Sequence, residues 1–153
     1  MKDYIKIGID KKLIDIIDDG KKILYTHQNK KYNYKDPEEQ VRASYYIELV
    51  ERYEYPPQRI NFEIPIPRRI QGDYADIVVF KDDEQKEPYI VVECKKDAIS
   101  DAEFLQAIEQ AFGNANNLNA HFISVVSGIT IKSFNLKDFK PLERVLNIIS
   151  DIP

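Results

Sequence analysis

Cysteine is nearly absent from this 153-residue sequence, in which Cys94 stands alone. A single cysteine excludes a disulfide within the chain and a zinc site built from cysteines. Long apolar runs are also missing, since none approaches the roughly 20 residues that span a membrane as a helix. Residues 1–4 lack the apolar core of a signal peptide. Together these absences predict a protein of the reducing cytoplasm.

An excess of positive charge is missing as well. The chain has 26 acidic and 22 basic residues, a formal net charge of −4. This balance argues against sequence-blind coating of nucleic acid, although it leaves room for a local basic groove. No Gly-x-x-x-x-Gly-Lys motif occurs, so the chain carries no phosphate loop and no motor of its own. Hydrophobic residues at 43% and charged residues at 31% are typical of a globular protein.

The spacing of apolar and turn residues predicts an α/β protein with a mixed sheet. Asp36 and Pro37 form a helix start, and Ser100 with Glu103 could form a capping box at a second one. The predicted elements are a helix over residues 36–53, strands over 60–66, 74–80 and 89–96, a helix over 100–118, strands over 122–126 and 129–134, and a closing helix over 141–150. A central mixed sheet with helices on both faces packs these elements naturally.

The N-terminal region is the least legible part of the chain. Residues 21–25 and 30–34 could pair as a hairpin, or the polar run between residues 29 and 36 could be a surface loop. We therefore expect one domain over residues 1–153, with a core over about 36–135. Residues 1–35 would be an N-terminal extension or hairpin.

Three charged residues lie within two apolar segments that otherwise read as buried strands. Asp76 follows Tyr-Ala and precedes Ile-Val-Val-Phe, and Glu93 and Lys95 end the run Tyr-Ile-Val-Val-Glu-Cys-Lys. Burying such groups unpaired costs several kcal/mol, so they are expected to pair, to bind a metal or to do chemistry. Strand alternation places Glu93 and Lys95 on one face and turns Cys94 into the core. The competing interpretation is a surface salt bridge at a strand end.

If the two segments are neighbouring strands, Asp76 and Glu93 could share one cation. Adjacent strands lie about 4.8 Å apart, and two acids that close repel unless a cation lies between them. Carboxylate oxygens with open positions suit Mg²⁺, and the Cys94 backbone carbonyl could add a further oxygen. Lys95 could position an attacking water and offset charge on a phosphate.

These segments resemble the PD-(D/E)XK nuclease superfamily, and most closely the N-terminal nuclease domain of type I restriction enzyme R (motor) subunits. The resemblance is carried by residues 37–42 (PEEQVR), Glu63, 75–79 (ADIVV), 91–95 (VVECK), 109–111 (EQA) and 125–128 (VVSG). It implies a restriction-endonuclease-like fold, a central mixed β-sheet flanked by helices. It also implies Mg²⁺-dependent hydrolysis of DNA, for which Mn²⁺ can substitute. Asp76 and Glu93 would bind the metal and Lys95 would be catalytic, supported by Glu38 or Glu39 from the first helix.

The sequence departs from the family pattern at two places. Ala75 replaces the proline that names the motif, at a position that varies in the family. Where the family often has Gln-x-x-x-Tyr, Gln110 is followed four residues later by Asn114, on the same helix face. Gln110 is expected to support the site. The candidate DNA contacts are Arg68, Arg69, Lys96 and Asn114.

The residues thus favour a DNA endonuclease of low intrinsic sequence specificity, because nothing in the chain resembles a base-reading helix. Its partners would be double-stranded DNA and motor, specificity or methylation subunits outside this chain. The alternative is a nuclease-fold module that binds nucleic acid or protein without cutting. A weaker alternative, a thiol enzyme, would need Cys94 exposed and acidic.

Overall fold

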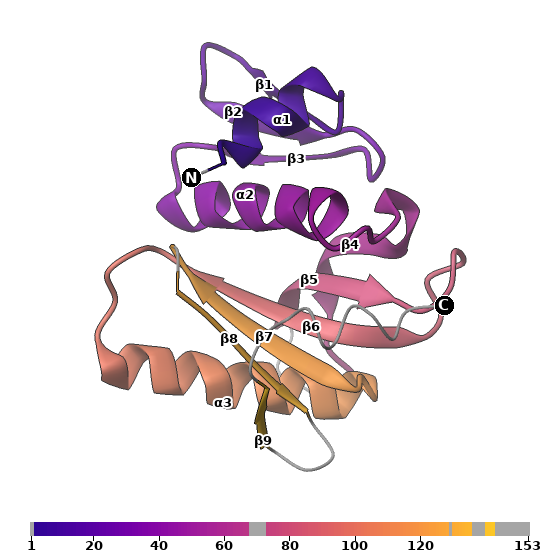
Figure 1. Cartoon of the computed structure of the whole chain (residues 1–153), viewed down its shortest axis with the longest axis vertical. Coiled ribbons are helices and arrows are strands. Elements are labelled where there is room, and N and C mark those ends of the chain that lie inside the picture. The colour runs from indigo at the N-terminus through magenta and orange to yellow at the C-terminus, as the bar shows by residue number, and fades with distance from the viewer. Residues whose placement is uncertain (1, 68–72, 129, 136–139, 143–153) are drawn as a thin grey trace.

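The computed structural model describes residues 2–67, 73–128, 130–135 and 140–142 (Figure 1). The candidate DNA contacts Arg68 and Arg69 lie outside the described residues, as does most of the predicted closing helix. Within the described part of the chain, no helix is long and apolar enough to span a membrane.

The N-terminal region forms a small layer of its own. A short helix, α1 (Tyr4–Asp10), is followed by β1 (Ile14–Ile17), β2 (Lys22–Tyr25) and β3 (Lys30–Asn33) in an antiparallel sheet. The register pairs Tyr25 with Lys30, so the hairpin interpretation of residues 21–34 is confirmed. The sequence did not indicate α1 or β1. Both are short, and they are stabilised by tertiary contacts, since α1 packs on α2 and β1 pairs with β2; local patterns cannot reveal such contacts.

The main sheet has six strands in the order β4-β5-β6-β7-β8-β9. The strands are β4 (Ile60–Pro65), β5 (Tyr74–Phe80), β6 (Pro88–Lys95), β7 (Phe122–Ser127), β8 (Thr130–Asn135) and β9 (Lys140–Leu142). A 3-10 turn, η1 (Pro57–Arg59), precedes β4. Among the described strands, β6 and β7 pair in parallel and the other pairs are antiparallel, which confirms the predicted mixed sheet. The prediction of a helix from residue 141 is wrong at its start, because β9 pairs with β8 there. This pairing joins residues five to nine positions apart in a hairpin, which helical periodicity does not report.

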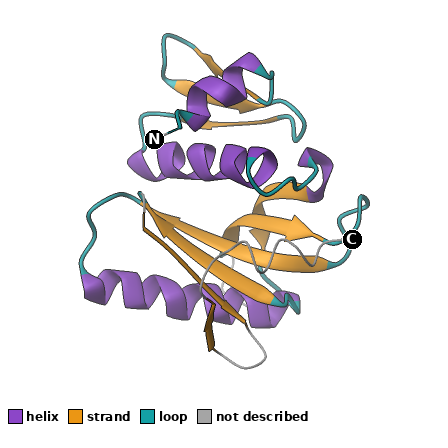
Figure 2. Cartoon of the chain, in the orientation of Figure 1, coloured by secondary structure: helices purple, strands orange, loops and turns teal. Residues whose placement is uncertain are grey.

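One long helix covers each face of the main sheet. The helix α2 (Pro37–Glu51) lies between the main sheet and the N-terminal sheet, and α3 (Asp101–Leu118) covers the opposite face (Figures 1 and 2). The N-termini of both helices are as predicted. The Asp36 carboxylate accepts the Glu38 N–H at 2.9 Å, and Ser100 and Glu103 form a reciprocal capping box.

Strand alternation divides the apolar residues into two cores. Ile77 and Val79 of β5 join the core beneath α2, while Val78 and Phe80 join the core beneath α3. Cys94 of β6 belongs to the α2 core, as the alternation of that strand predicts. The α2 core continues into the N-terminal sheet, so a single apolar interior joins the three layers on that side.

Candidate active site

The site lies where the pairing of β5 and β6 ends. The last pair in that ladder is Ile77 with Val92, one residue before Asp76 and Glu93. The carboxylate of Asp76 accepts the backbone N–H of Cys94 at 2.8 Å. A side chain of β5 thus bonds β6 at the point where the backbone ladder stops. Meanwhile β6 stays paired with β7 as far as Lys95, which fixes its position.

Glu93 is a buried acid beside Asp76. Its side chain points to the α3 side of the sheet, where it is 1% exposed and accepts the Asn114 amide N–H at 3.0 Å. Burial raises the pKa of Glu93 well above its ordinary value, and the charge of Asp76 and a hydrogen bond with Asp76 raise it further. Lys95 and Asn114 act in the opposite direction. The two acids of neighbouring strands therefore meet, as the sequence led us to expect.

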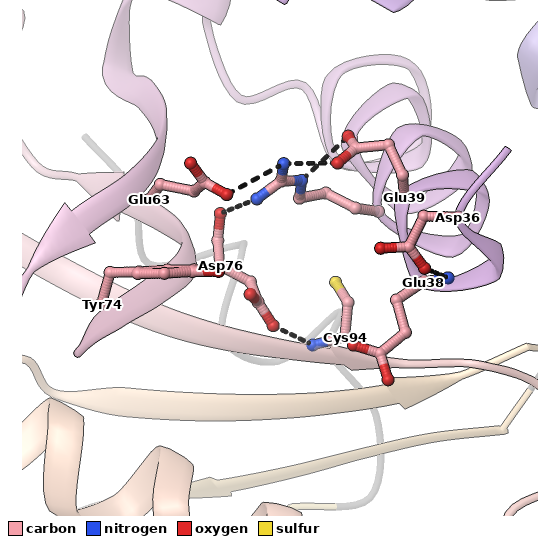
Figure 3. Close-up of a pocket in the computed structure, with 8 residues that line it drawn as sticks. Asp36, Glu38, Glu39, Glu63, Tyr74, Asp76 and Cys94 are labelled. Atoms are coloured by element: carbon pink, nitrogen blue, oxygen red, sulfur yellow. Dashed lines mark hydrogen bonds and ion pairs between the residues drawn. The ribbon is translucent and has the colours of Figure 1, made fainter. Parts of the chain in front are cut away.

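Glu38 is the first-helix glutamate that faces these residues. Its carboxylate reaches down from the first turn of α2 toward β6 and Cys94 (Figure 3). Burial raises the pKa of Glu38, while the charge of Lys95 and a hydrogen bond from the Lys96 backbone N–H lower it, and Asp76 raises it. Lys95 is half-buried, and its positive charge acts on both Glu38 and Glu93. The sequence left Glu38 and Glu39 as alternatives, and the fold places Glu38 at the site.

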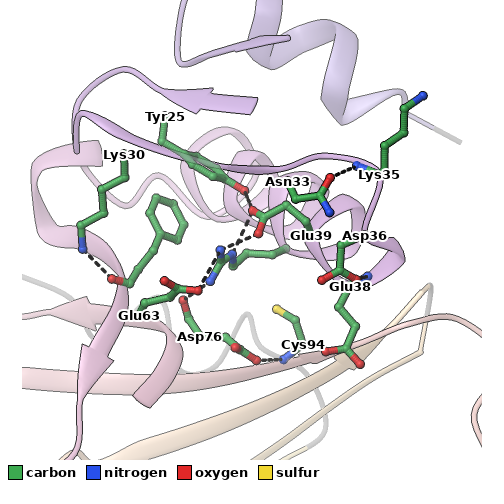
Figure 4. Close-up of polar contacts among 12 residues, drawn as sticks. Tyr25, Lys30, Asn33, Lys35, Asp36, Glu38, Glu39, Glu63, Asp76 and Cys94 are labelled. Carbon is green, nitrogen blue, oxygen red and sulfur yellow. Dashed lines mark hydrogen bonds and ion pairs between the residues drawn. The ribbon is translucent and has the colours of Figure 1, made fainter. Parts of the chain in front are cut away.

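Glu39 lines the same cavity as Glu38 and Asp76, but its carboxylate is held in a buried polar cluster. Its carboxylate forms an ion pair with Arg42 and accepts the Tyr25 hydroxyl at 2.6 Å. Figure 4 shows the Glu39 carboxylate turned toward Tyr25, while the Glu38 carboxylate is turned toward Cys94 and β6. Arg42 ends the segment PEEQVR that carried the family resemblance, but the sequence analysis assigned it no role at the site.

Hydrogen bonds on two sides hold the segment that follows β6. The backbone N–H of Lys96 bonds Glu38, and its carbonyl accepts the Ser127 hydroxyl at 2.7 Å. Gly128 follows with φ +57°, and a Cβ built there would lie 2.3 Å from the Asp97 carboxylate. The turn after β7 therefore packs against the turn after β6, which fixes the direction in which Lys95 leaves the sheet.

Gly128→Ala is expected to destabilise the protein by about 2–4 kcal/mol. The left-handed backbone costs a residue with a Cβ about 1–2 kcal/mol, and the overlap with Asp97 adds to this cost. Gly20→Ala is the matched control. Gly20 has φ +81° with nothing near its Cβ position, so this variant should lose only about 1–2 kcal/mol. Urea denaturation of both variants measures the difference, and equal losses would contradict the packing argument.

The remaining predicted site residues are placed as follows. Gln110 and Lys96 are exposed, and Asn114 is buried with its amide bonded to Glu93. The fold thus gives Asn114 a partner inside the protein, and its DNA contact stays a prediction. Cys94 is 2% exposed, and burial raises the pKa of its thiol well above the usual value. A buried, weakly acidic thiol does not meet the requirement of a thiol enzyme.

The donor set of the site fits a divalent cation bound mainly by oxygen. Asp76 and Glu93 bring two carboxylates together, and both burial and the charge of Asp76 raise the pKa of Glu93. Within the described residues, no group of three or more His, Cys, Asp or Glu side chains is arranged to hold a metal. Mg²⁺ fits such a site because it commonly takes only one or two carboxylates and completes its coordination with water and phosphate.

Comparison with known protein families agrees with this geometry. A mixed sheet flanked by helices, with acids meeting where two strands part, is consistent with the restriction-endonuclease-like fold and the PD-(D/E)XK nuclease superfamily. The family described as "Type I restriction enzyme R protein N terminus (HSDR_N)" matches residues 37–153. The chain belongs to this family, which confirms the resemblance seen in the sequence and supports a restriction-related role. The match begins at the first residue of α2 and leaves out α1 and the N-terminal sheet. Searches of curated proteins and of solved structures found no match.

Proposed function

We propose that this chain is a Mg²⁺-dependent endonuclease domain that hydrolyses DNA phosphodiesters with low intrinsic sequence specificity. The observation that carries the proposal is the meeting of Asp76, Glu93 and Lys95 at the end of the β5–β6 ladder. Chemistry explains this arrangement better than stability does, because a buried acid beside a second acid weakens the fold. Membership of a restriction-enzyme family supports the same reaction class.

Each residue of the site has a role that follows from its position. Asp76 and Glu93 would hold the cation, and the carbonyl of Cys94, which lies between Glu93 and Lys95 in the sequence, would be a further oxygen ligand. Bound Mg²⁺ would supply positive charge against the phosphate and help to orient the attacking water. Lys95 orients that water and offsets the negative charge that develops on the phosphate as the bond to the 3′ oxygen breaks.

Glu38 and Asn114 support these groups. The negative charge of Glu38 keeps the Lys95 ammonium directed into the site, and its bond to the Lys96 N–H anchors the strand end. Asn114 donates to Glu93 and so fixes the direction of that carboxylate. The exposed Lys96 is available to a DNA phosphate.

The substrate would be double-stranded DNA delivered by other subunits. A motor and a specificity or methylation subunit would select where the DNA is cut. The nuclease itself would then need only contacts to the DNA backbone, which carry no sequence information.

Nicking of supercoiled plasmid in Mg²⁺ or Mn²⁺ tests the proposal. The parent should nick, while Asp76→Ala and Lys95→Ala should lose at least about 100-fold in rate, since each removes charge stabilisation worth several kcal/mol. Lys86→Ala is a matched control, because this exposed lysine pairs with Glu84 in the β5–β6 loop, away from the site.

Equal nicking by all four proteins would contradict the assigned site. A folded parent that binds DNA and fails to nick it, even with its motor subunit present, would favour the non-cleaving module.

A further inference from the structure

Arg42 is a buried cation whose guanidinium is shared between the N-terminal layer and the candidate active site. It is 4% exposed. Its Nε and Nη2 atoms donate to the two oxygens of Glu39, at 3.0 and 2.5 Å. The Tyr25 hydroxyl of β2 donates to that same carboxylate. The ring of Tyr32 in β3 lies under the guanidinium, with its centroid 4.3 Å from the central carbon.

The remaining edge of the guanidinium points at Asp76. Its Nη1 donates to the Asp76 backbone carbonyl at 3.3 Å (Figures 3 and 4). The Nη2 atom also lies 3.7 Å from Glu63. Arg42 therefore contacts β4 and β5 on one side, and it also contacts Glu39 of its own helix and the Tyr32 ring of the N-terminal sheet.

Asp76 needs such an anchor because it has no paired residue in the β4–β5 ladder or in the β5–β6 ladder. In the β4–β5 ladder the pairs are Phe62 with Ile77 and Ile64 with Ala75, so Asp76 has no partner between them. Glu63, which would stand opposite, has φ +51° and departs from strand geometry. In the β5–β6 ladder the last pair is Ile77 with Val92. In the described structure Asp76 is thus outside both ladders.

We propose that Arg42 is a positioning residue for Asp76, and that the N-terminal sheet holds Arg42 in place through Tyr25 and Glu39. The chain of contacts runs from Tyr25 to Glu39, to Arg42 and to the Asp76 carbonyl, and the Asp76 carboxylate then bonds the Cys94 N–H. A layer outside the family match would in this way set the geometry of the proposed metal site. The positioning of Asp76 does not depend on the proposed function, but the expected effect of Arg42 on DNA cleavage rests on it.

Arg42→Lys and Tyr25→Phe, made in the full chain, test the proposal. A lysine has one compact head group and cannot bond both Glu39 oxygens and the Asp76 carbonyl together. Tyr25→Phe removes only the hydroxyl that donates a hydrogen bond to Glu39.

Tyr46→Phe is the matched control for Tyr25→Phe, because Tyr46 packs edge-on against Tyr25 but its hydroxyl bonds Gln28. Arg52→Lys is the control for Arg42, because Arg52 pairs with Glu48 on the exposed side of α2.

Two readouts separate positioning from general stability. The first is hydrogen exchange of the Cys94 amide, which needs no activity, compared with the Val92 amide in the same strand. We expect the rate of Cys94 exchange to rise at least about 10-fold in Arg42→Lys, and to rise by less in Tyr25→Phe, while the rate at Val92 stays unchanged.

The second readout is plasmid nicking. Its kcat should fall about 10- to 100-fold in Arg42→Lys, the range for residues that orient metal ligands. The KM for DNA should stay within about twofold, because Arg42 is buried and does not contact DNA.

The outcomes distinguish this proposal from the nuclease proposal. If Cys94 exchange rises only as much as Val92 exchange, and activity falls in step with melting temperature, Arg42 is only a structural ion pair and the proposal is overturned. Unchanged exchange in both variants also overturns it. If the variants show faster exchange at Cys94 but not at Val92, while the parent cleaves no DNA, the positioning role is supported and the nuclease proposal is contradicted.

Discussion

Glu93→Gln is expected to abolish DNA cleavage and, at the same time, to stabilise the metal-free protein. The variant removes one of the two carboxylates proposed to hold Mg²⁺, so nicking should fall at least about 1,000-fold, or about 4 kcal/mol of transition-state stabilisation. The glutamine can still accept the Asn114 N–H, and its own amide can donate to Asp76. It no longer buries a charge, and we expect a gain of about 1–3 kcal/mol near neutral pH.

The pH dependence gives this prediction a sharper test. The pKa of Glu93 is raised in the folded protein relative to its ordinary value of 4.5. The stability that this shift contributes is fully present below the unfolded pKa and is lost as the pH rises through the folded pKa. In EDTA, ionisation of Glu93 should therefore lower the free energy of unfolding of the parent as the pH rises above about 4.5. The Glu93→Gln variant should lack this decrease.

Urea denaturation at a series of pH values measures this difference. Glu109→Gln is the matched control, since Glu109 is an exposed acid of α3, and it should change neither activity nor stability. A parent and a Glu93→Gln variant with parallel pH profiles would show that the buried acid carries no such penalty. Nicking retained by the variant would remove Glu93 from the metal site.

Phe62→Ala is expected to be the most destabilising of the variants considered, by about 3–5 kcal/mol. Phe62 is fully buried in β4, with its ring centroid 4.1 Å from that of Tyr25 and 5.1 Å from that of Tyr46. It thus joins the main sheet to α2 and to the N-terminal sheet in one aromatic cluster. Removing the ring leaves a cavity at the junction of three layers, which such a rigid set of neighbours cannot fill.

Thermal melting followed by circular dichroism, together with urea denaturation, measures this loss. Because the cluster is shared, the N-terminal layer and the main sheet should still unfold in one transition at a lower temperature. Leu105→Ala is the control, because Leu105 of α3 is 56% exposed and its loss should change stability by less than about 0.5 kcal/mol. Separate unfolding of the N-terminal layer in the parent would contradict the single shared core.

The elements from residue 36 to residue 135 were predictable because their signals are local. Asp36 and Ser100 cap the helices that their side chains predicted, and the alternation of β6 correctly turned Cys94 into the core. The errors lie where a segment's structure depends on the element that it pairs with or packs against. The N-terminal layer is stabilised by α2, and β9 forms because β8 offers it an edge.

The candidate site was predictable to a similar degree and for a similar reason. Charge inside an apolar strand is visible in a sequence, because burial makes it costly, and that signal marked Asp76, Glu93 and Lys95. Arg42 and Asn114 were harder to assign. A polar residue on a helix has many possible partners, and the bonds to Asp76 and Glu93 arise only when α2 and α3 pack on opposite faces of the sheet.

The sequence by itself determined the sheet-and-helix class, the resemblance to the family and the three charged residues at the centre of the site. Those properties follow from periodicity, capping and the cost of buried charge, which act along a few residues of chain. Only the tertiary structure decided that Glu38 faces the site while its neighbour Glu39 faces Arg42. Consecutive helix positions point about 100° apart, so the choice between them depends on how α2 is rotated against the sheet.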